Sequence, residues 1–289
     1  MKKIVVLGST GMAGHIISLY LEHHGFDVFR ISRSETNSDK SSKIDVSNTD
    51  ELMTCIDEIK ADVVVNCVGL LQKSCEERPD LAVLINSYLP HCLENHYRGT
   101  ETKIIHLSTD CVFSGKKGCY TEEDLPDGRT FYDRSKALGE INNKKDLTFR
   151  MSIIGPDIDA SGTGLLNWFM KQTGQVNGFT NALWNGITTL ELAEAIEAAV
   201  NENISGVYQL VPKEYISKHD LLILFKKIFE KNDVDILPDS NFVMDKTLVN
   251  NRKDFMYLVK SYPEQLIRLR QWIEENSELY PDYYSKKTL

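Results

Sequence analysis

The sequence predicts an α/β protein with a doubly wound parallel sheet, and three observations lead to that prediction. Short segments rich in Val and Ile alternate with amphipathic segments through the first half of the chain. These apolar segments are almost continuous, as expected of parallel strands that are buried on both faces. A glycine-rich turn follows the first apolar segment, at residues 8–14.

Each element of the first half is assigned from its own pattern. Segments with apolar residues at intervals of three and four are predicted as helices, and short β-branched runs are predicted as strands. Because the two alternate, helices are expected on both faces of the sheet. The predicted strands are residues 3–7, 27–31, 62–66, 103–107 and 147–151, and the predicted helices are residues 12–24, 48–59, 79–97 and 132–143.

The pattern changes after residue 150. Helices are expected at residues 164–172, 188–200, 217–231 and 263–276, with a strand at 206–211, whereas residues 232–259 have no clear pattern. We therefore expect a first domain at 1–150. A smaller, mixed α/β lobe at 151–289 would bind the substrate, with some of its segments returning to the first domain.

The turn formed by Gly8, Gly11 and Gly14 has the spacing of a dinucleotide-binding turn. The first glycine permits the tight turn, the second lets the backbone approach a pyrophosphate, and the third allows close packing of helix and strand. The N-terminus of the following helix would present free N–H groups to the phosphates. The turn therefore predicts a Rossmann-type domain that binds NAD(H) or NADP(H).

The end of the second predicted strand, "FRISRSE", bears on the choice of cofactor. A carboxylate there usually binds the ribose 2′-hydroxyl of NAD(H), whereas an arginine accommodates the 2′-phosphate of NADP(H). Arg33 favours NADP(H), and Glu35 keeps NAD(H) open.

Composition argues against several classes of function. The net charge of −9 argues against a broad nucleic-acid surface, and no apolar segment approaches the length of a membrane span. We expect neither partner. The six cysteines have no metal-site spacing, so no metal is expected, and free thiols fit a reducing cytoplasm. The cysteines are residues 55, 67, 75, 92, 111 and 119.

The stretch "TFYDRSK" places Tyr132 and Lys136 four residues apart. On a helix this spacing puts both side chains on one face, with the ammonium group one turn from the phenol. Ordinary solvated helix surfaces also contain such pairs. The interpretation of this pair therefore depends on the segments around it.

Three segments in order, "STDCVFSG" (108–115), "YTEEDLPD" (120–127) and "YDRSKALGE" (132–140), carry a resemblance to a known family. Together they resemble the extended short-chain dehydrogenases/reductases, and more narrowly the dTDP-4-dehydrorhamnose reductase branch. The resemblance covers residues 1 to about 155. Beyond that it is limited to "GLLNWFM", "TTLELAEAI" and "GVYQLV".

The resemblance implies reduction of a ketone by a nicotinamide hydride, with Tyr132 as the general acid. Lys136 would lower the pKa of the phenol and hold the nicotinamide ribose, and Thr109 would orient the substrate carbonyl; Ser108 ranks second for that role. Lowering the pKa by ~3 units from about 10 requires about 4 kcal/mol, which a close ammonium group and hydrogen bonds can supply. Asn86 is expected to support the site from behind.

The cofactor site expected from the glycine turn and the resemblance combines several loops. Asp45 matches the family's acid near the adenine, and residues 66–69 match a backbone segment that passes under the cofactor. The expected cofactor-binding residues are Gly8, Thr10, Gly11, Met12, Arg33, Asp45, Val46, Cys67, Val68, Gly69, Tyr132 and Lys136.

Three alternatives to a reductase are compatible with the resemblance to different degrees. A 4,6-dehydratase needs a glutamate after Thr-Asp, and this chain has Cys111 there. An epimerase with tightly bound NAD uses the same Thr, Tyr and Lys and stays open. A non-catalytic regulatory subunit, like the β subunit of methionine adenosyltransferase, also stays open, although intact Thr109, Tyr132 and Lys136 favour an enzyme.

The substrate is expected to be a nucleotide-linked 4-keto-6-deoxy sugar used in bacterial surface polysaccharides. Arg252 is followed by Lys253 where the branch has Arg-Pro, so a dTDP-linked and a UDP-linked N-acetylated sugar are equally plausible. A homodimer is a further expectation. The residues expected to contact substrate are Asp110, Arg150, Asn167, Trp184 and Arg252.

Overall fold

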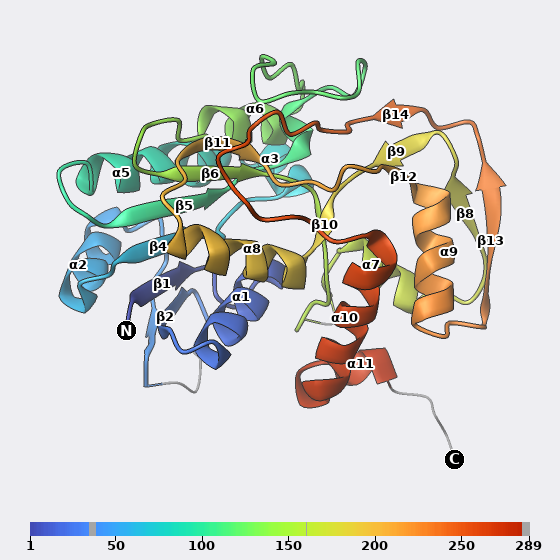
Figure 1. The fold of residues 1–289 in the computed structure, drawn as a ribbon, viewed down its shortest axis with the longest axis horizontal. Helices are drawn as coiled ribbons and strands as arrows, with labels where there is room; N and C mark the ends of the chain where they lie inside the picture. The colour runs from blue at the N-terminus through green and yellow to red at the C-terminus, as the bar shows by residue number, and fades with distance from the viewer. Residues whose placement is uncertain (35–38, 160, 285–289) are drawn as a thin grey trace.

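The computed structural model describes residues 1–34, 39–159 and 161–284. Its main feature is a seven-stranded sheet in the order β11-β6-β5-β4-β1-β2-β3 (Figure 1). Every neighbouring pair in it is parallel, and the order reverses between β1 and β4, as in Rossmann-type sheets. The strands are β1 Lys3–Leu7, β2 Asp27–Ser32, β3 Ser41–Lys43, β4 Val63–Asn66, β5 Lys103–Leu107, β6 Leu147–Arg150 and β11 Gly206–Gln209.

Helices cover both faces of this sheet, which confirms the predicted fold class. Alternate side chains of β1 point to opposite faces. Ile4 and Val6 pack in one core with α1 (Met12–His23) and α8 (Thr189–Asn201), whereas Val5 and Leu7 pack in a second core with α2 (Thr49–Ile59) and α5 (Leu89–His96). Figure 1 shows these two helical layers on either side of the strands.

The smaller lobe, at the right of Figure 1, consists of short strand pairs and helices. Strand β8 (Gly174–Phe179) pairs with β13 (Val234–Asp239), and β9 (Ala182–Trp184) lies between β12 (Ile216–Ser217) and β14 (Met244–Asp245). Strand β7 (Ile153–Ile154) pairs with β10 (Ile187–Thr188). The helices of this half are α7 Leu165–Met170, α9 Lys218–Ile228, α10 Tyr262–Glu275, η3 Ser277–Leu279 and α11 Pro281–Tyr284.

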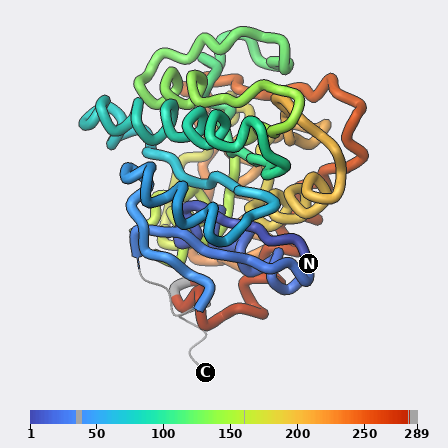
Figure 2. Tube along the Cα trace, turned by 90° about the vertical axis from the view of Figure 1, so that its left-hand side faces the viewer, coloured from blue at the N-terminus to red at the C-terminus, as the bar shows by residue number. Residues whose placement is uncertain are grey.

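Residues after 150 also complete the first domain. Strand β11 extends the large sheet beside β6, and α8 packs against α1. The C-terminal segment packs on α1 as well, where the Tyr280 hydroxyl lies 2.8 Å from His15 Nε2. The red C-terminal part of the chain lies next to the blue N-terminal part in both views (Figures 1 and 2). One hydrophobic core therefore joins residues from both halves of the chain.

Some predicted boundaries were wrong. The helix predicted over 132–143 is α6, Phe131–Leu138, and it ends at the cap residue Gly139. The helix predicted over 79–97 contains a π-helical segment, and residues 232–259, which had no clear pattern, contain β13 and β14. The remaining elements are α3 Gln72–Glu77, α4 Pro79–Ala82, the π-helical η1 Val83–Tyr88 and η2 Asp110–Val112.

Within the described ranges, no helix is both long and apolar enough to span a bilayer. The same residues contain no group of three or more His, Cys, Asp or Glu side chains suited to hold a metal ion. All six cysteines are free thiols.

Candidate active site

The glycine turn joins β1 to α1 in the way that a dinucleotide requires. Gly8 has a φ of +74°, and a Cβ there would lie 3.2 Å from Val68 Cγ2. A Cβ on Gly14 would collide with the Gly8 carbonyl oxygen, so glycine at 14 lets α1 start close to the strand. The buried Ser9 hydroxyl has no partner among the described residues, and Thr10 and Gly11 are exposed. The turn therefore offers free donors and open backbone to a pyrophosphate.

A cation and a carboxylate lie near each other just after two neighbouring strands, Arg33 after β2 and Asp45 after β3. Arg33 is exposed just after the strand, and Glu35 lies outside the described residues. Hydrogen bonds from Ser47 lower the pKa of Asp45, and the charge of Arg33 adds to that lowering. Arg33 and Asp45 are therefore within electrostatic reach of each other, and Val46 beside them is buried.

The segment after β4 lies against the glycine turn. Asn66 fixes its start, because its Oδ1 accepts a hydrogen bond from Val68 N at 3.1 Å. Cys67 and Val68 are half-buried and Gly69 is exposed. Met12, at the start of α1, lies close to Gly164 from the smaller lobe. The structure thus brings the predicted cofactor residues to one edge of the sheet.

Thr109, Tyr132 and Lys136 meet at the carboxyl end of β5. Thr109 directly precedes η2, and its Oγ1 lies 3.1 Å from both Asp110 Oδ1 and the Cys111 amide N. A capping box between Thr130 and Asp133 starts α6, the helix that carries Tyr132 and Lys136. Lys136 is buried, and its Nζ donates to the Leu107 carbonyl at 2.7 Å. The ammonium group is therefore anchored to the strand that presents Thr109.

The pKa of Tyr132 departs from expectation. Burial raises it, the nearby Cys111, Asp110 and Cys75 raise it further, and a hydrogen bond with Thr109 opposes the rise. Desolvation dominates this pKa because it disfavours the phenolate, and the lowering by Lys136 stays a prediction. The contact with Thr109 nevertheless places the two hydroxyls together. Tyr132 stays protonated at neutral pH, which is the form that a proton donor needs.

The Lys136 ammonium group lies close to buried polar side chains that were not predicted from the sequence. His106 Nε2 lies 3.4 Å from Lys136 Nζ, and Asn66 Nδ2 lies 3.2 Å from His106 Nδ1. Burial lowers the pKa of Lys136 to about 8 and that of His106 well below its usual range. The signal available in the sequence was a histidine inside the otherwise apolar strand "KIIHL".

Asn86 supports α6 from behind, as expected. It lies in η1 and is fully buried, and its side-chain amide bonds both Leu70 backbone groups and donates to Ser135 Oγ at 3.1 Å. A Cβ on Gly139 would collide with the Asn86 carbonyl oxygen, which explains the glycine at the end of α6. The π-helical turn thus fixes the helix that carries the Tyr–Lys pair.

Arg150, predicted to contact substrate, is instead an interior residue. Its Nε and Nη2 donate to the Glu140 carboxylate at 2.7 and 2.6 Å, and both side chains are almost fully buried. Ser108 Oγ donates to the same carboxylate at 2.7 Å. Arg150 is therefore held by Glu140, and the pair secures Ser108 and with it the end of β5.

Two other residues that were predicted to contact substrate, Asn167 and Arg252, form hydrogen bonds with other residues of the protein. Asn167 is buried, and its side chain bonds the Gly162 carbonyl and the Tyr283 hydroxyl. Arg252 pairs with Asp254, and its Nη1 donates to the Ser205 and Val207 carbonyls at 2.6 and 2.9 Å.

Trp184, which was expected to contact substrate, lies at the end of β9 and is only 3% exposed. Its ring packs on Tyr262 with 5.8 Å between ring centroids, and Lys218 Nζ lies 4.6 Å from the ring centroid on α9's side. Trp184 is therefore a packed residue of the smaller lobe that also contacts a partly buried cation.

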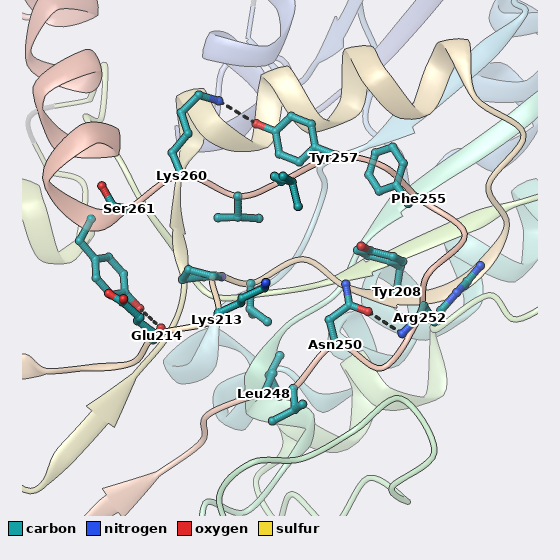
Figure 3. A pocket seen from close by; sticks show the side chains of 16 residues that line it. Tyr208, Lys213, Glu214, Leu248, Asn250, Arg252, Phe255, Tyr257, Lys260 and Ser261 are labelled. Atoms are coloured by element: carbon teal, nitrogen blue, oxygen red, sulfur yellow. Dashed lines mark hydrogen bonds between the residues drawn. The ribbon is translucent and has the colours of Figure 1, made fainter.

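Arg252 lines a cavity of about 530 Å³ that is distinct from the Tyr132 site (Figure 3). This cavity lies between β11 and the chain segment 248–262 and shares no lining residue with the glycine turn, Thr109, Tyr132 or Lys136. A hydrophobic cluster that includes Val112, Phe113 and Leu248 packs against Ala137 of α6, and Leu248 also lines the cavity. We therefore assign the chemistry to the Tyr132 site.

Comparison with known proteins gives the same family as the motifs. A family profile described as "RmlD substrate binding domain" matches residues 1–280. The chain is 32% identical over 238 residues to a probable low-salt glycan biosynthesis reductase, Agl14, of Haloferax volcanii, covering 74% of this chain and 76% of that protein. It is 30% identical over 138 residues to a dTDP-4-dehydrorhamnose reductase of Streptomyces griseus, covering 47% of this chain and 43% of the relative.

Solved structures of the family have the same fold. The structure of a dTDP-4-dehydrorhamnose reductase from Bacillus anthracis in complex with NADP superposes with a TM-score of 0.79 at 18% identity, covering 94% of this chain and 99% of that one. The match over nearly the whole chain and the sequence similarity to the Haloferax protein agree with the resemblance carried by the motifs. The chain therefore belongs to the family of the RmlD substrate binding domain and has the extended short-chain dehydrogenase/reductase fold.

Proposed function

We propose that this protein is an oxidoreductase that reduces the 4-keto group of a nucleotide-linked 6-deoxy sugar with NADPH. The observation that carries the proposal is that Lys136 Nζ donates to the Leu107 carbonyl at 2.7 Å, which holds the helix of Tyr132 at the end of the strand that presents Thr109, beside a glycine turn suited to a dinucleotide. The names of the relatives support a place in glycan biosynthesis, and the substrate is a dTDP-linked sugar or a UDP-linked N-acetylated one.

The residues of this chain would divide the work as follows. When bound, NADPH would supply the hydride that reduces the keto carbon. The Tyr132 phenol then gives its proton to the oxygen that becomes an alkoxide, and solvent restores that proton. Thr109 donates a hydrogen bond to the same oxygen once it releases Asp110. Lys136, anchored on Leu107, would hold the nicotinamide ribose and stabilise the phenolate that remains.

Two other functions predict different results. An epimerase would retain NAD tightly through purification and would consume none of it. A regulatory subunit would bind the dinucleotide and leave every keto sugar unchanged. A dehydratase is disfavoured because Cys111 supplies no carboxylate, and burial raises the pKa of its thiol to about 12.

The function is tested by offering purified protein each sugar with each cofactor. We expect oxidation of NADPH with a dTDP- or UDP-linked 4-keto-6-deoxy sugar, followed at 340 nm, and little dinucleotide carried through purification. Retained NAD with interconversion of sugar epimers would instead identify an epimerase.

The preference for NADPH is a separate prediction that rests on Arg33. Replacing Arg33 by Ala should weaken NADPH binding by about 1.5–3 kcal/mol, the value of a hydrogen bond to a charged group, and should leave NADH binding nearly unchanged. Titration calorimetry with both cofactors measures the difference. Equal losses for the two cofactors would show that Arg33 does not contact a 2′-phosphate.

A further inference from the structure

A buried histidine of α1 is hydrogen-bonded to the glycine turn. His15 lies one helical turn after Gly11, the N-cap of α1, and is only 3% exposed. Its ring Nδ1 lies 2.9 Å from the Gly11 carbonyl oxygen, which also accepts the backbone N–H of His15 at 3.1 Å. Glycine has no side chain that could cap a helix, so a side-chain hydrogen bond to this turn has to come from another residue. His15 supplies one from inside α1.

The C-terminal segment fixes the protonation of this ring. The Tyr280 hydroxyl lies 2.8 Å from His15 Nε2, and Trp272 Nε1–H donates to the Tyr280 oxygen at 3.3 Å. A carbonyl oxygen can only accept, so His15 Nδ1 carries the ring proton and Nε2 accepts from Tyr280. Burial lowers the pKa of His15 to about 4, so the ring is neutral at pH 7 and keeps this single tautomer.

The Gly11 carbonyl bears on cofactor binding through the peptide group to which it belongs. A trans peptide is planar, so the N–H of Met12 points away from the Gly11 carbonyl oxygen. That oxygen points along α1 toward His15, and the Met12 N–H therefore points out of the helix N-terminus. The N–H groups at this end are the donors expected to bind a pyrophosphate. A rotation of the peptide would turn one donor away from the phosphates.

The same C-terminal segment also contacts the part of the smaller lobe that lies beside Met12. The Tyr283 hydroxyl donates to Asn167 Oδ1 at 3.4 Å and accepts the Asp157 N–H at 3.3 Å. These bonds hold the part of the lobe that contains Gly164, where a Cβ would lie 3.0 Å from Met12 Sδ. The segment that fixes the His15 ring therefore also positions a neighbour of Met12.

We propose that His15 is a positioning residue for the dinucleotide cofactor: held in one tautomer by Tyr280, it fixes the Gly11 carbonyl and thereby aims the Met12 N–H at the pyrophosphate. The inference rests on the proposed function only in taking a dinucleotide as the ligand, since the sugar and its reduction play no part in it. It gives Tyr280, 265 positions from His15, a role in cofactor binding.

Two substitutions that each keep one nitrogen of the ring separate positioning from packing. In His15→Asn the side-chain amide takes the place of Nδ1–H and can still donate to Gly11, whereas in His15→Gln it takes the place of Nε2 and faces Tyr280. Titration calorimetry with the full chain would give the NADPH affinity of both variants. We expect His15→Gln to weaken NADPH binding by about threefold to tenfold, the effect of one lost hydrogen bond, and His15→Asn to retain most of the affinity.

The same helix supplies a matched control variant. His24 Nδ1 lies 2.7 Å from the Tyr20 carbonyl oxygen, a contact with the same four-residue spacing at the opposite end of α1. His24→Gln should therefore leave NADPH affinity unchanged. Adenosine 2′-monophosphate, which has no pyrophosphate, is the control ligand and should bind all of these variants as it binds the unaltered protein.

Nitrogen NMR of the unaltered protein examines the tautomer directly. We expect His15 to be protonated on Nδ1 and not on Nε2, and Tyr280→Phe to give a mixture of tautomers. A proton on Nε2 in the unaltered protein, or equal NADPH affinities of the Asn and Gln variants, would overturn the proposal. Failure of the proposed function would look different: NADPH would bind with the predicted dependence on His15, and no keto sugar would be reduced.

Discussion

Replacing Tyr132 by Phe is expected to lower turnover of the keto sugar by roughly 10²–10⁴-fold, because the reaction then lacks its positioned proton donor. The change removes only a hydroxyl, so the helix α6, its capping box and the anchoring of Lys136 on Leu107 should persist. Steady-state kinetics with saturating NADPH measures the loss. Near-full turnover in this variant would show that another group supplies the proton.

Lys136→Ala serves as the contrasting variant. It removes the ammonium group that donates to the Leu107 carbonyl, and should reduce both turnover and cofactor affinity. Tyr132→Phe should spare cofactor affinity. In the double variant the losses in turnover should not add, because both residues act on one proton transfer. Additive losses would mean that the two residues act in separate steps.

The largest loss of stability is expected from Glu140→Ala. This carboxylate accepts hydrogen bonds from Arg150 Nε, Arg150 Nη2 and Ser108 Oγ, and its removal leaves a buried guanidinium group beside the Phe113 ring without a counter-charge. Breaking a buried pair in this way costs about 3–5 kcal/mol of unfolding free energy. Urea denaturation followed by circular dichroism measures it.

A solvent-exposed pair provides the control for that measurement. Arg78 and Asp80 form a hydrogen-bonded ion pair at the surface, and both side chains are more than half exposed. Asp80→Ala should leave the urea midpoint close to that of the unaltered protein, because exposed pairs contribute little. A similar loss of stability from both substitutions would mean that Arg150 is better solvated than the structure shows.

Local patterns were sufficient to predict the Rossmann half. The β-branched strands and the glycine turn are short-range signals, and they predicted five of the seven strands of the large sheet. The short strand β3 was not predicted, and β11 joins the sheet from the second half of the chain. The smaller lobe was predicted only in outline. Its strands β7, β9, β10, β12 and β14 have two or three residues each, too few to show a period, and they exist because distant segments pair.

The candidate site also has one part that local sequence patterns predict and another part that only the fold reveals. Thr109, Tyr132 and Lys136 come from contiguous motifs, whereas Glu140 and His106 act through partners that only the fold brings near. Arg150 shows where prediction from sequence stops. A charged residue at a strand end suggests that the residue binds a ligand, but the Arg150 guanidinium group is paired with the carboxylate of Glu140, ten positions earlier. The rise in the pKa of Tyr132 also depends on burial, which spacing along a helix does not encode.

Deuterium transfer tests the central claim most directly. The protein would be incubated with NADPH deuterated at the transferable position of the nicotinamide and with dTDP- and UDP-linked 4-keto-6-deoxy sugars, and the products examined by NMR and mass spectrometry. The account predicts deuterium at C4 of one reduced sugar, in one configuration, with one NADPH oxidised per sugar formed. Recovery of every keto sugar unreduced, with protein that binds NADPH normally, would contradict it.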